Sequence, residues 1–245
     1  MMKKLFCITL ATVLMCMSGV TAFAKSSDIE VLDGEQLENT VILADYETED
    51  YTVKAFETNG EYVVVTYYEE FYEICRRQID SFVITSEQYD YNGNLITSDV
   101  CDYSNFEDVT SGNQEISEPY PYAVGEYQHT ISNYEYDIDG GAGGRYEIWT
   151  CTRRSDEKVR SVHDTTSALF ERLDHWRTLV NDINDYEKDL GITAGETAVA
   201  TAIEIYFLKS PTAALTFLLG LGDVVEIFEG FDESIVQADK VFNRI

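Results

Sequence analysis

Basic residues are scarce in this chain. Its 245 residues include 17 Lys and Arg against 45 Asp and Glu, so the formal net charge is -28. A field of that sign repels nucleic acid and anionic membrane surfaces at long range, and nucleic acid is therefore not an expected partner. The preferred interpretation of the acidic charge is that it keeps the protein soluble outside the cell. The charge also favours cationic ligands or basic partners.

The sequence lacks common catalytic motifs. It contains no G-x-S-x-G, no H-E-x-x-H and no C-x-x-C. Of the three histidines, His163 and His175 are too far apart along an expected helix to share a zinc ion. His129 with Cys101 or Cys151 could form a base and a thiol nucleophile, but a disulfide is preferred in an exported chain. A non-catalytic protein is therefore favoured, and an enzyme that uses scattered carboxylates, which form no motif in the sequence, stays open as an alternative.

No apolar run is long enough to span a bilayer, which takes about 20 residues. At the start of the chain, Lys3 and Lys4 precede an apolar stretch and then Ala22-Phe23-Ala24. A charged segment, a short apolar segment and an A-x-A site are typical of a secretory signal peptide. We expect residues 1–24 to be removed near Ala24 and the protein to be secreted or extracytoplasmic.

Cysteines are few, and their number after cleavage is odd. Cys75, Cys101 and Cys151 remain, which predicts one disulfide and one further thiol. Three pairings are open. Cys75–Cys151 is favoured because both residues fall in expected strands.

What the chain does contain is tyrosine, and most of it lies in one region. Fifteen of the 17 tyrosines fall between Tyr46 and Tyr146, among Val, Ile and Thr, a composition that suits strands. Residues 25–50 form an acidic arm with an expected edge strand at its end. Residues 51–154 are predicted to be an antiparallel β meander of six or seven strands, as a sheet or partial barrel. Asn59-Gly60 is typical of a type I′ hairpin turn.

A glycine-rich loop follows Asp137 and Asp139 in the last expected strand pair. A hairpin loop explains these residues without a metal and is the preferred interpretation. The alternative is a calcium site formed by Asp137, Asp139 and Glu147, although the glycine and glutamate of a calcium-binding loop are missing from their usual positions. The polar stretch 103–124 is predicted to be a long loop.

Beyond a charged linker at 155–160, the pattern becomes helical. Val162, Leu169, Trp176, Ile183 and Leu190 recur every seven residues, which predicts a long helix that ends at Gly191. Thr193 and Glu196 have the spacing of a capping box, and Ser210-Pro211 is typical of a helix start. Residues 155–245 are thus predicted to be a bundle of three or four helices, and the fold class to be α+β.

The least polar segment, residues 193–228, has two interpretations. It either fills the core of the helical domain or inserts into a membrane through Leu215, Phe217, Leu218 and Leu221. The order of signal peptide, polar middle and apolar C-terminal hairpin resembles that of secreted pore-forming bacteriocins and antimicrobial precursors. That resemblance implies membrane action, the one case in which a membrane would be a partner. Core packing is preferred because Glu204 interrupts the apolar run.

The sequence thus predicts an exported, non-catalytic binding protein. Its expected partner is a protein or cell-surface ligand. The partner would bind through exposed tyrosines of the sheet, whose amphipathic rings suit interfaces, or through the loop 103–124. A membrane-active toxin or precursor is the alternative.

Overall fold

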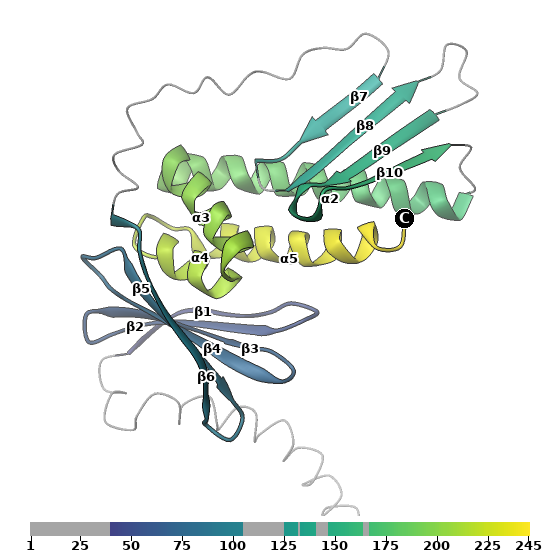
Figure 1. The fold of residues 1–245 in the computed structure, drawn as a ribbon. Helices are drawn as coiled ribbons and strands as arrows, with labels where there is room; N and C mark the ends of the chain where they lie inside the picture. The colour runs from purple at the N-terminus through teal and green to yellow at the C-terminus, as the bar shows by residue number, and fades with distance from the viewer. Residues whose placement is uncertain (1–39, 105–124, 132, 141–146, 164–166) are drawn as a thin grey trace, which may run out of the picture. The chain divides into compact units, whose positions relative to one another are not determined.

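The structure is a computed structural model, and it describes residues 40–104, 125–131, 133–140, 147–163 and 167–245. Ten strands and four α-helices are found in these residues, with the strands first and the helices last (Figure 1). This order confirms the predicted α+β class. The predicted signal peptide and most of the acidic arm lie outside the described residues.

The first six strands form one antiparallel meander. Its order is β1-β2-β3-β4-β5-β6, so each strand pairs with its neighbours in the chain. The strands are β1 (Val41–Glu47), β2 (Thr52–Thr58), β3 (Glu61–Tyr67), β4 (Phe71–Gln78), β5 (Val83–Asp90) and β6 (Leu95–Asp102). Asn59 and Gly60 join β2 to β3 with φ of 53° and 81°, as the predicted type I′ turn requires.

The remaining strands form a second antiparallel sheet, in the order β10-β9-β8-β7. They are β7 (Gly125–His129), β8 (Tyr134–Gly140), β9 (Glu147–Arg153) and β10 (Lys158–His163). The expected linker at 155–160 and the helical position of Val162 are therefore wrong. After the 3-10 turn η3 (Arg154–Asp156), Glu157 adopts φ 54°, and the chain returns along β9 so that Val162 pairs with Trp149. Val162 is in a strand because it pairs with β9. The seven-residue spacing of Val162 with later residues carries no information about that partner strand.

The helices are α2 (Ser167–Ala194), α3 (Glu196–Leu208), α4 (Pro211–Leu218) and α5 (Val225–Phe242). The seam of α2 is buried at Leu173, Trp176, Val180, Ile183 and Leu190, and α2 packs along α5 within the chain (Figure 1). Helix α5 continues through Gly230, a residue at which a helix could be expected to break. A Cβ at Gly230 would collide with the ring of Tyr186, so this glycine allows α2 and α5 to approach closely.

Two predicted helix ends differ from the structure and one is confirmed. Helix α2 passes Gly191, and the chain turns instead at Gly195 with φ 95°. The Thr193 hydroxyl donates to the Asp189 carbonyl at 2.8 Å, so Thr193 does not cap α3. Ser210 caps α4 as expected, because its Oγ accepts the Ala213 amide at 3.1 Å and Pro211 is the first helical residue.

Helix α4 is held against the six-stranded sheet by Arg77. Its Nε donates to the Thr216 carbonyl at 2.9 Å, and its Nη2 donates to the carbonyl of Leu219. The guanidinium lies over the rings of Tyr62 and Phe82, 5.0 Å from each centroid. Carbonyls at a helix C-terminus lack partners within the helix and favour a cation. Arg77 therefore fixes the end of α4 on the sheet.

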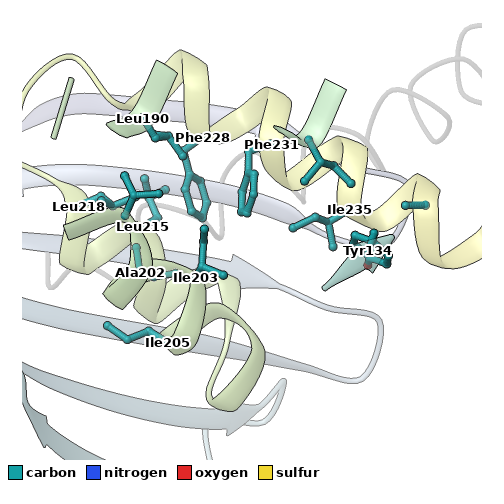
Figure 2. Close-up of a cluster of buried hydrophobic side chains, with 14 of the residues drawn as sticks. Tyr134, Leu190, Ala202, Ile203, Ile205, Leu215, Leu218, Phe228, Phe231 and Ile235 are labelled. Carbon is teal, nitrogen blue, oxygen red and sulfur yellow. The ribbon is translucent and has the colours of Figure 1, made fainter. Parts of the chain in front are cut away.

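The apolar hairpin lies in the core. Leu215, Phe217 and Leu218 are fully buried, and Leu221 is partly buried against the same cluster. Figure 2 shows Leu215 and Leu218 among the buried side chains of this cluster. None of the helices in the described part of the chain combines the length and the apolar character needed to cross a membrane.

Candidate functional site

A polar pocket lies on the side of the β4–β6 strands that faces α4. The antiparallel register aligns Glu73 with Gln88 and Gln88 with Thr97. The next aligned row, two residues along, contains Cys75, Ser86 and Asp99. Because strand side chains alternate between faces, these two rows share one face of the sheet. The meander therefore brings together polar groups that are up to 26 residues apart in sequence.

The junction of α3 and α4 provides the opposite wall of this pocket. Lys209, just after α3, forms an ion pair with Asp99, and Ala213 contributes from the first turn of α4. Ile84, Cys101 and Tyr103 line the remainder, and the cavity has a volume of about 160 Å³. We call this cavity the Glu73 pocket.

Glu73 is the only acidic side chain of the pocket that is buried, with 3 % of its surface exposed. Its Oε1 accepts a hydrogen bond from the Ser86 hydroxyl at 2.7 Å and a longer one from the Cys75 thiol at 3.8 Å. Its Oε2 is buried and has no hydrogen-bond partner among the described residues. Burial, together with the charge of Glu73, raises the pKa of the Cys75 thiol. Cys75 is therefore a thiol donor rather than a nucleophile.

Asp99 and Lys209 form the exposed rim of the pocket. The hydrogen bond from Lys209 lowers the pKa of Asp99, and the same bond raises the pKa of Lys209. Both groups are therefore charged at neutral pH. Cys101 donates its thiol to Asp99 Oδ2 at 3.5 Å. The rim is neutral as an ion pair, and Glu73 is the other acidic side chain of the pocket.

Tyrosines lie on the opposite face of the same sheet. Tyr67 pairs in register with Tyr72, and Tyr72 pairs with Tyr89. The Tyr72 ring stacks on Tyr89 with 5.4 Å between centroids and lies 6.1 Å from Tyr67 and 6.0 Å from Tyr91. None of the four is buried, and Tyr91 is 56 % exposed. We call these four residues the tyrosine surface.

Carboxylates surround the tyrosine surface. The Tyr89 hydroxyl donates to Glu87 Oε2 at 3.0 Å, and Asp90 adds to the effect of burial in raising the pKa of Tyr72. Glu69 and Glu70 are exposed in the turn between β3 and β4. Burial and the hydrogen bond to Glu87 raise the pKa of Tyr89. Arg76 is the only cation among the groups that shift this pKa, and its charge lowers it. The acidic character of the whole chain is thus present at this surface.

A second buried carboxylate, Asp232 of α5, is fully enclosed. It accepts hydroxyl hydrogen bonds from Tyr46 at 2.9 Å, from Tyr51 at 2.6 Å and from Tyr206 at 2.7 Å. Burial raises the pKa of Asp232, while the three donors act in the opposite direction. The donors come from β1, the β1–β2 turn and α3. Asp232 therefore joins three separate elements to α5.

Of the three predicted calcium ligands, only Asp137 and Asp139 have described side chains. Asp137 and Asp139 lie in β8, and Glu147 pairs with Gly140 at the start of β9. Burial, followed by the charges of Asp139 and Glu135, raises the pKa of Asp137. No group of three potential metal ligands occurs within the described residues. The side chain of Glu147 and the loop 141–146 lie outside them, so calcium binding here stays a prediction.

The predicted Cys75–Cys151 disulfide is absent. Cys75, Cys101 and Cys151 are all free thiols, and Cys75 and Cys151 are buried. Cys75 lies in β4 and Cys151 in β9, which belong to different sheets. The sequence indicated that both residues lie in strands. It did not indicate that β4 pairs with β3 and β5 while β9 pairs with β8 and β10. Burial raises the pKa of Cys151 to about 12, which disfavours the thiolate.

Ser155 and Lys158 have the S-x-x-K spacing of one class of serine nucleophile. Ser155 lies in the η3 turn and Lys158 begins β10, so the two residues do not share a helix face. Ser155 Oγ accepts the Asn133 amide at 3.0 Å, and Lys158 pairs with Asp156 at 2.6 Å. The lysine is therefore engaged by a carboxylate instead of the serine. The side chain of His129, the proposed base, lies outside the described residues.

Glu73 and Asp232 were both missed by sequence reasoning. Asp232 lies four residues after Phe228 and three before Ile235, so helical spacing places it on the apolar face of α5. A carboxylate on the apolar face of a helix indicates that buried hydrogen-bond donors accompany it. Glu73 gave a weaker signal, because both faces of β4 carry apolar and charged residues.

Comparison with known proteins adds no relative. No family model, curated protein or solved structure matches this chain.

Proposed function

We propose that this protein is an exported, non-catalytic binding protein that recognises a basic segment of a partner protein through the tyrosine surface. The observation that carries the proposal is the row of Tyr67, Tyr72 and Tyr89 across three adjacent strands, with none of the three buried. Tyrosine offers a large ring and a hydroxyl with little conformational freedom to lose, and it is enriched at protein interfaces.

The charge around the tyrosines supports a basic partner. Glu69, Glu70, Glu87 and Asp90 lie on or beside the strands that carry them, within a chain of net charge -28. Complementary charge increases association rates and selects against acidic competitors. Binding should therefore weaken as salt concentration rises.

A purely stabilising role is the competing explanation for the tyrosines. Cross-strand aromatic pairs stabilise a sheet by roughly 0.2–1 kcal/mol each, with or without a ligand. An experiment can distinguish the two roles. Truncation of a residue that is a binding hot spot weakens the binding free energy by about 2 kcal/mol or more, whereas truncation of a residue that only stabilises the sheet leaves binding by the folded protein unchanged.

The test compares capture of partners by the purified chain and by a Tyr72→Ser/Tyr89→Ser variant. Extracts of the cells that express the protein supply the partners, and captured proteins are then titrated individually at low and high salt. The matched control is Ile192→Ser/Leu208→Ser, which removes two side chains that are 84 % and 70 % exposed elsewhere. Loss of a basic partner only in the tyrosine variant supports the proposal. Equal binding by all three proteins contradicts it.

The burial of Leu215, Phe217 and Leu218 favours this function over membrane action, because insertion would first require these residues to leave the core. Dye release from liposomes by the chain, abolished by Leu218→Glu, would support the membrane-active alternative instead.

A further inference from the structure

A second cavity is larger than the Glu73 pocket and is lined mainly by aromatic side chains. Its volume is about 410 Å³. Binding sites for small molecules usually measure about 300–1,000 Å³, and an apolar cavity of roughly 150 Å³ accommodates benzene. Four of the lining residues, from the β1–β2 turn, the β3–β4 turn and α3, are aromatic: Tyr51, Tyr68, Tyr206 and Phe207. We call this cavity, which these four residues line together with Asp239 of α5, the aromatic cavity.

Three of the rings are held by residues outside the lining. The hydroxyls of Tyr51 and Tyr206 donate to Asp232 at 2.6 Å and 2.7 Å. The ring of Tyr68 stacks on Phe71 with 4.6 Å between centroids, and it lies 5.2 Å from the ring of Tyr51. A ligand in the cavity therefore meets side chains whose conformations are fixed before it binds, so less side-chain entropy is lost on binding.

The floor and the opening of the cavity differ in polarity. Ile235 and Val236 line its floor and are 2 % and 7 % exposed. Asp50 and Asn243 are exposed and mark the opening. An apolar floor with aromatic walls suits a flat ring, because aromatic rings pack favourably with centroids about 4.5–7 Å apart.

The lysine at the opening is not available to an anion. Lys240 Nζ pairs with Asp50 at 2.6 Å and with Glu49 at 3.0 Å. The hydrogen bond to Asp50, followed by the one to Glu49, raises the pKa of Lys240. The side chains of Asp50 and Glu49 are 51 % and 64 % exposed, against 30 % for Lys240. An anion would therefore meet two exposed carboxylates beside one compensated ammonium group.

Asp239 is the acidic residue of the lining that keeps an available acceptor. Its Oδ1 accepts hydrogen bonds from Arg153 and Tyr134, each at 3.1 Å. Its Oδ2 accepts none among the described residues and is not buried, and the side chain is 48 % exposed. Hydrogen bonds to Asp156 and to Asp239 raise the pKa of Arg153, as expected for carboxylates that carry charge. A cationic N–H donor at the opening can therefore reach a charged acceptor.

We propose that the aromatic cavity binds an aromatic ammonium compound, with its ring among the aromatic side chains and its ammonium group donating to Asp239 Oδ2. The net charge of -28 favours the approach of such a cation. The site uses none of the residues of the tyrosine surface, so this activity goes beyond the proposed partner binding and does not depend on it.

The experiment is a calorimetric titration of the purified chain with tryptamine hydrochloride at neutral pH and low salt. Three further probes separate the contributions of ring and charge. Tryptophol has the same ring with a neutral hydroxyl, indoleacetate has the same ring with a carboxylate, and hexylammonium is a cation without a ring.

Saturable binding of tryptamine is expected, about fivefold tighter than that of tryptophol, because an ion pair near the surface contributes up to about this factor. Indoleacetate should bind more weakly than tryptophol. Hexylammonium should bind about tenfold more weakly than tryptamine, since it cannot stack.

Two variants test the role of charge. Asp239→Asn keeps the shape of the side chain and an acceptor for Arg153. It should remove the preference for tryptamine over tryptophol while affinity for tryptophol stays unchanged. Asp182→Asn removes an exposed carboxylate on α2, so it controls for net charge and should keep the preference.

Two further variants test the cavity itself. Phe207→Leu removes one ring of the lining and should weaken binding of tryptamine and tryptophol about fivefold. Val236→Phe fills part of the cavity, keeps Asp239, and should also weaken both. Circular dichroism verifies that each variant is folded, and either of the two keeps the test decisive if the other does not fold.

Four results would each overturn the proposal. The first is no saturable binding of tryptamine to the unmodified chain, and the second is equal affinity for tryptamine and tryptophol. The third is undiminished binding to folded Phe207→Leu or Val236→Phe. The fourth is an unchanged preference for tryptamine in folded Asp239→Asn.

Discussion

Glu73 and Asp232 are both buried carboxylates, with 3 % and 0 % of their surface exposed, but their surroundings differ. Asp232 accepts three tyrosine hydroxyls, which occupy both of its oxygens. Glu73 has donors on one oxygen only, and it lines a cavity. A neighbouring cavity of about 410 Å³ is lined by Tyr51 and Tyr206 but not by Asp232 itself.

The difference separates a carboxylate with donors on both oxygens from one with donors on a single oxygen. A carboxylate that receives donors on both oxygens stabilises the elements that supply those donors. A carboxylate that receives donors on one oxygen only is held by fewer contacts. The completeness of the donor set, rather than burial alone, therefore indicates the role of each residue.

The largest expected effect is the loss of Asp232. Asp232→Ala leaves the hydroxyls of Tyr46, Tyr51 and Tyr206 without their acceptor. Since each unsatisfied buried group costs about 1–3 kcal/mol, the free energy of unfolding should fall by about 3 kcal/mol or more. Chemical denaturation measures this. Glu233→Ala, an exposed neighbour on the same helix, should change it by less than about 0.5 kcal/mol. Similar losses in both variants would contradict the structural role of Asp232.

The second effect concerns pH. Burial raises the pKa of Asp232 above its ordinary value of 3.8, so the folded state binds a proton more tightly than the unfolded state. The proton-linked part of its contribution to stability is fully present below pH 3.8 and is lost as the pH rises through the folded pKa.

Stability measured across this pH range should therefore favour the unmodified chain over Asp232→Asn progressively less as the pH rises. The slope of the difference can reach about -1.4 kcal/mol per pH unit, the value for one proton. Comparison of the two proteins removes the contributions of the other carboxylates. A difference that grows with pH would show that the tyrosine donors outweigh burial.

A smaller effect is expected for Ser86→Ala, which removes the 2.7 Å hydrogen bond to Glu73 Oε1. Only the long contact with Cys75 then remains, and stability should fall by about 1 kcal/mol in urea denaturation. Thr85→Ala, on the other face of β5, provides a control for the loss of a hydroxyl in this strand. A loss near 3 kcal/mol would mean that Glu73 resembles Asp232 in role.

The smallest effect is expected for Glu73→Gln. The glutamine carbonyl can keep the Ser86 hydrogen bond, and the amide replaces the oxygen that lacks a partner. Stability should change by less than about 1 kcal/mol, in either direction. Thermal or chemical unfolding of the two proteins in parallel measures the difference. A large destabilisation by Glu73→Gln would contradict the difference in role between Glu73 and Asp232.

Local patterns predicted much of the fold. Asn59-Gly60 predicted its hairpin, Ser210-Pro211 predicted the start of α4, and the heptad positions from Leu173 to Leu190 predicted the buried side of α2. Each is a property of a few neighbouring residues whose backbone preference or spacing is sufficient. Val162 shows the limit, since it fitted the same repeat but lies in β10.

The candidate sites were less predictable. Exposed tyrosines were expected, because tyrosine is abundant in the strand region and its amphipathic ring suits interfaces, but which of them share a face depended on strand register. The Glu73 pocket could not be derived, since it requires β4, β5, β6 and the α3–α4 junction to meet.

By itself, the sequence determined the acidic charge, the α+β class and the order of strands and helices, because composition and period act locally along the chain. Only the tertiary structure decided that strands 125–163 form a separate sheet, that Cys75 and Cys151 stay apart, and that Asp232 is satisfied while Glu73 is not. These depend on which distant segments pack together, and hydrogen bonds between such segments leave no periodic pattern in the sequence.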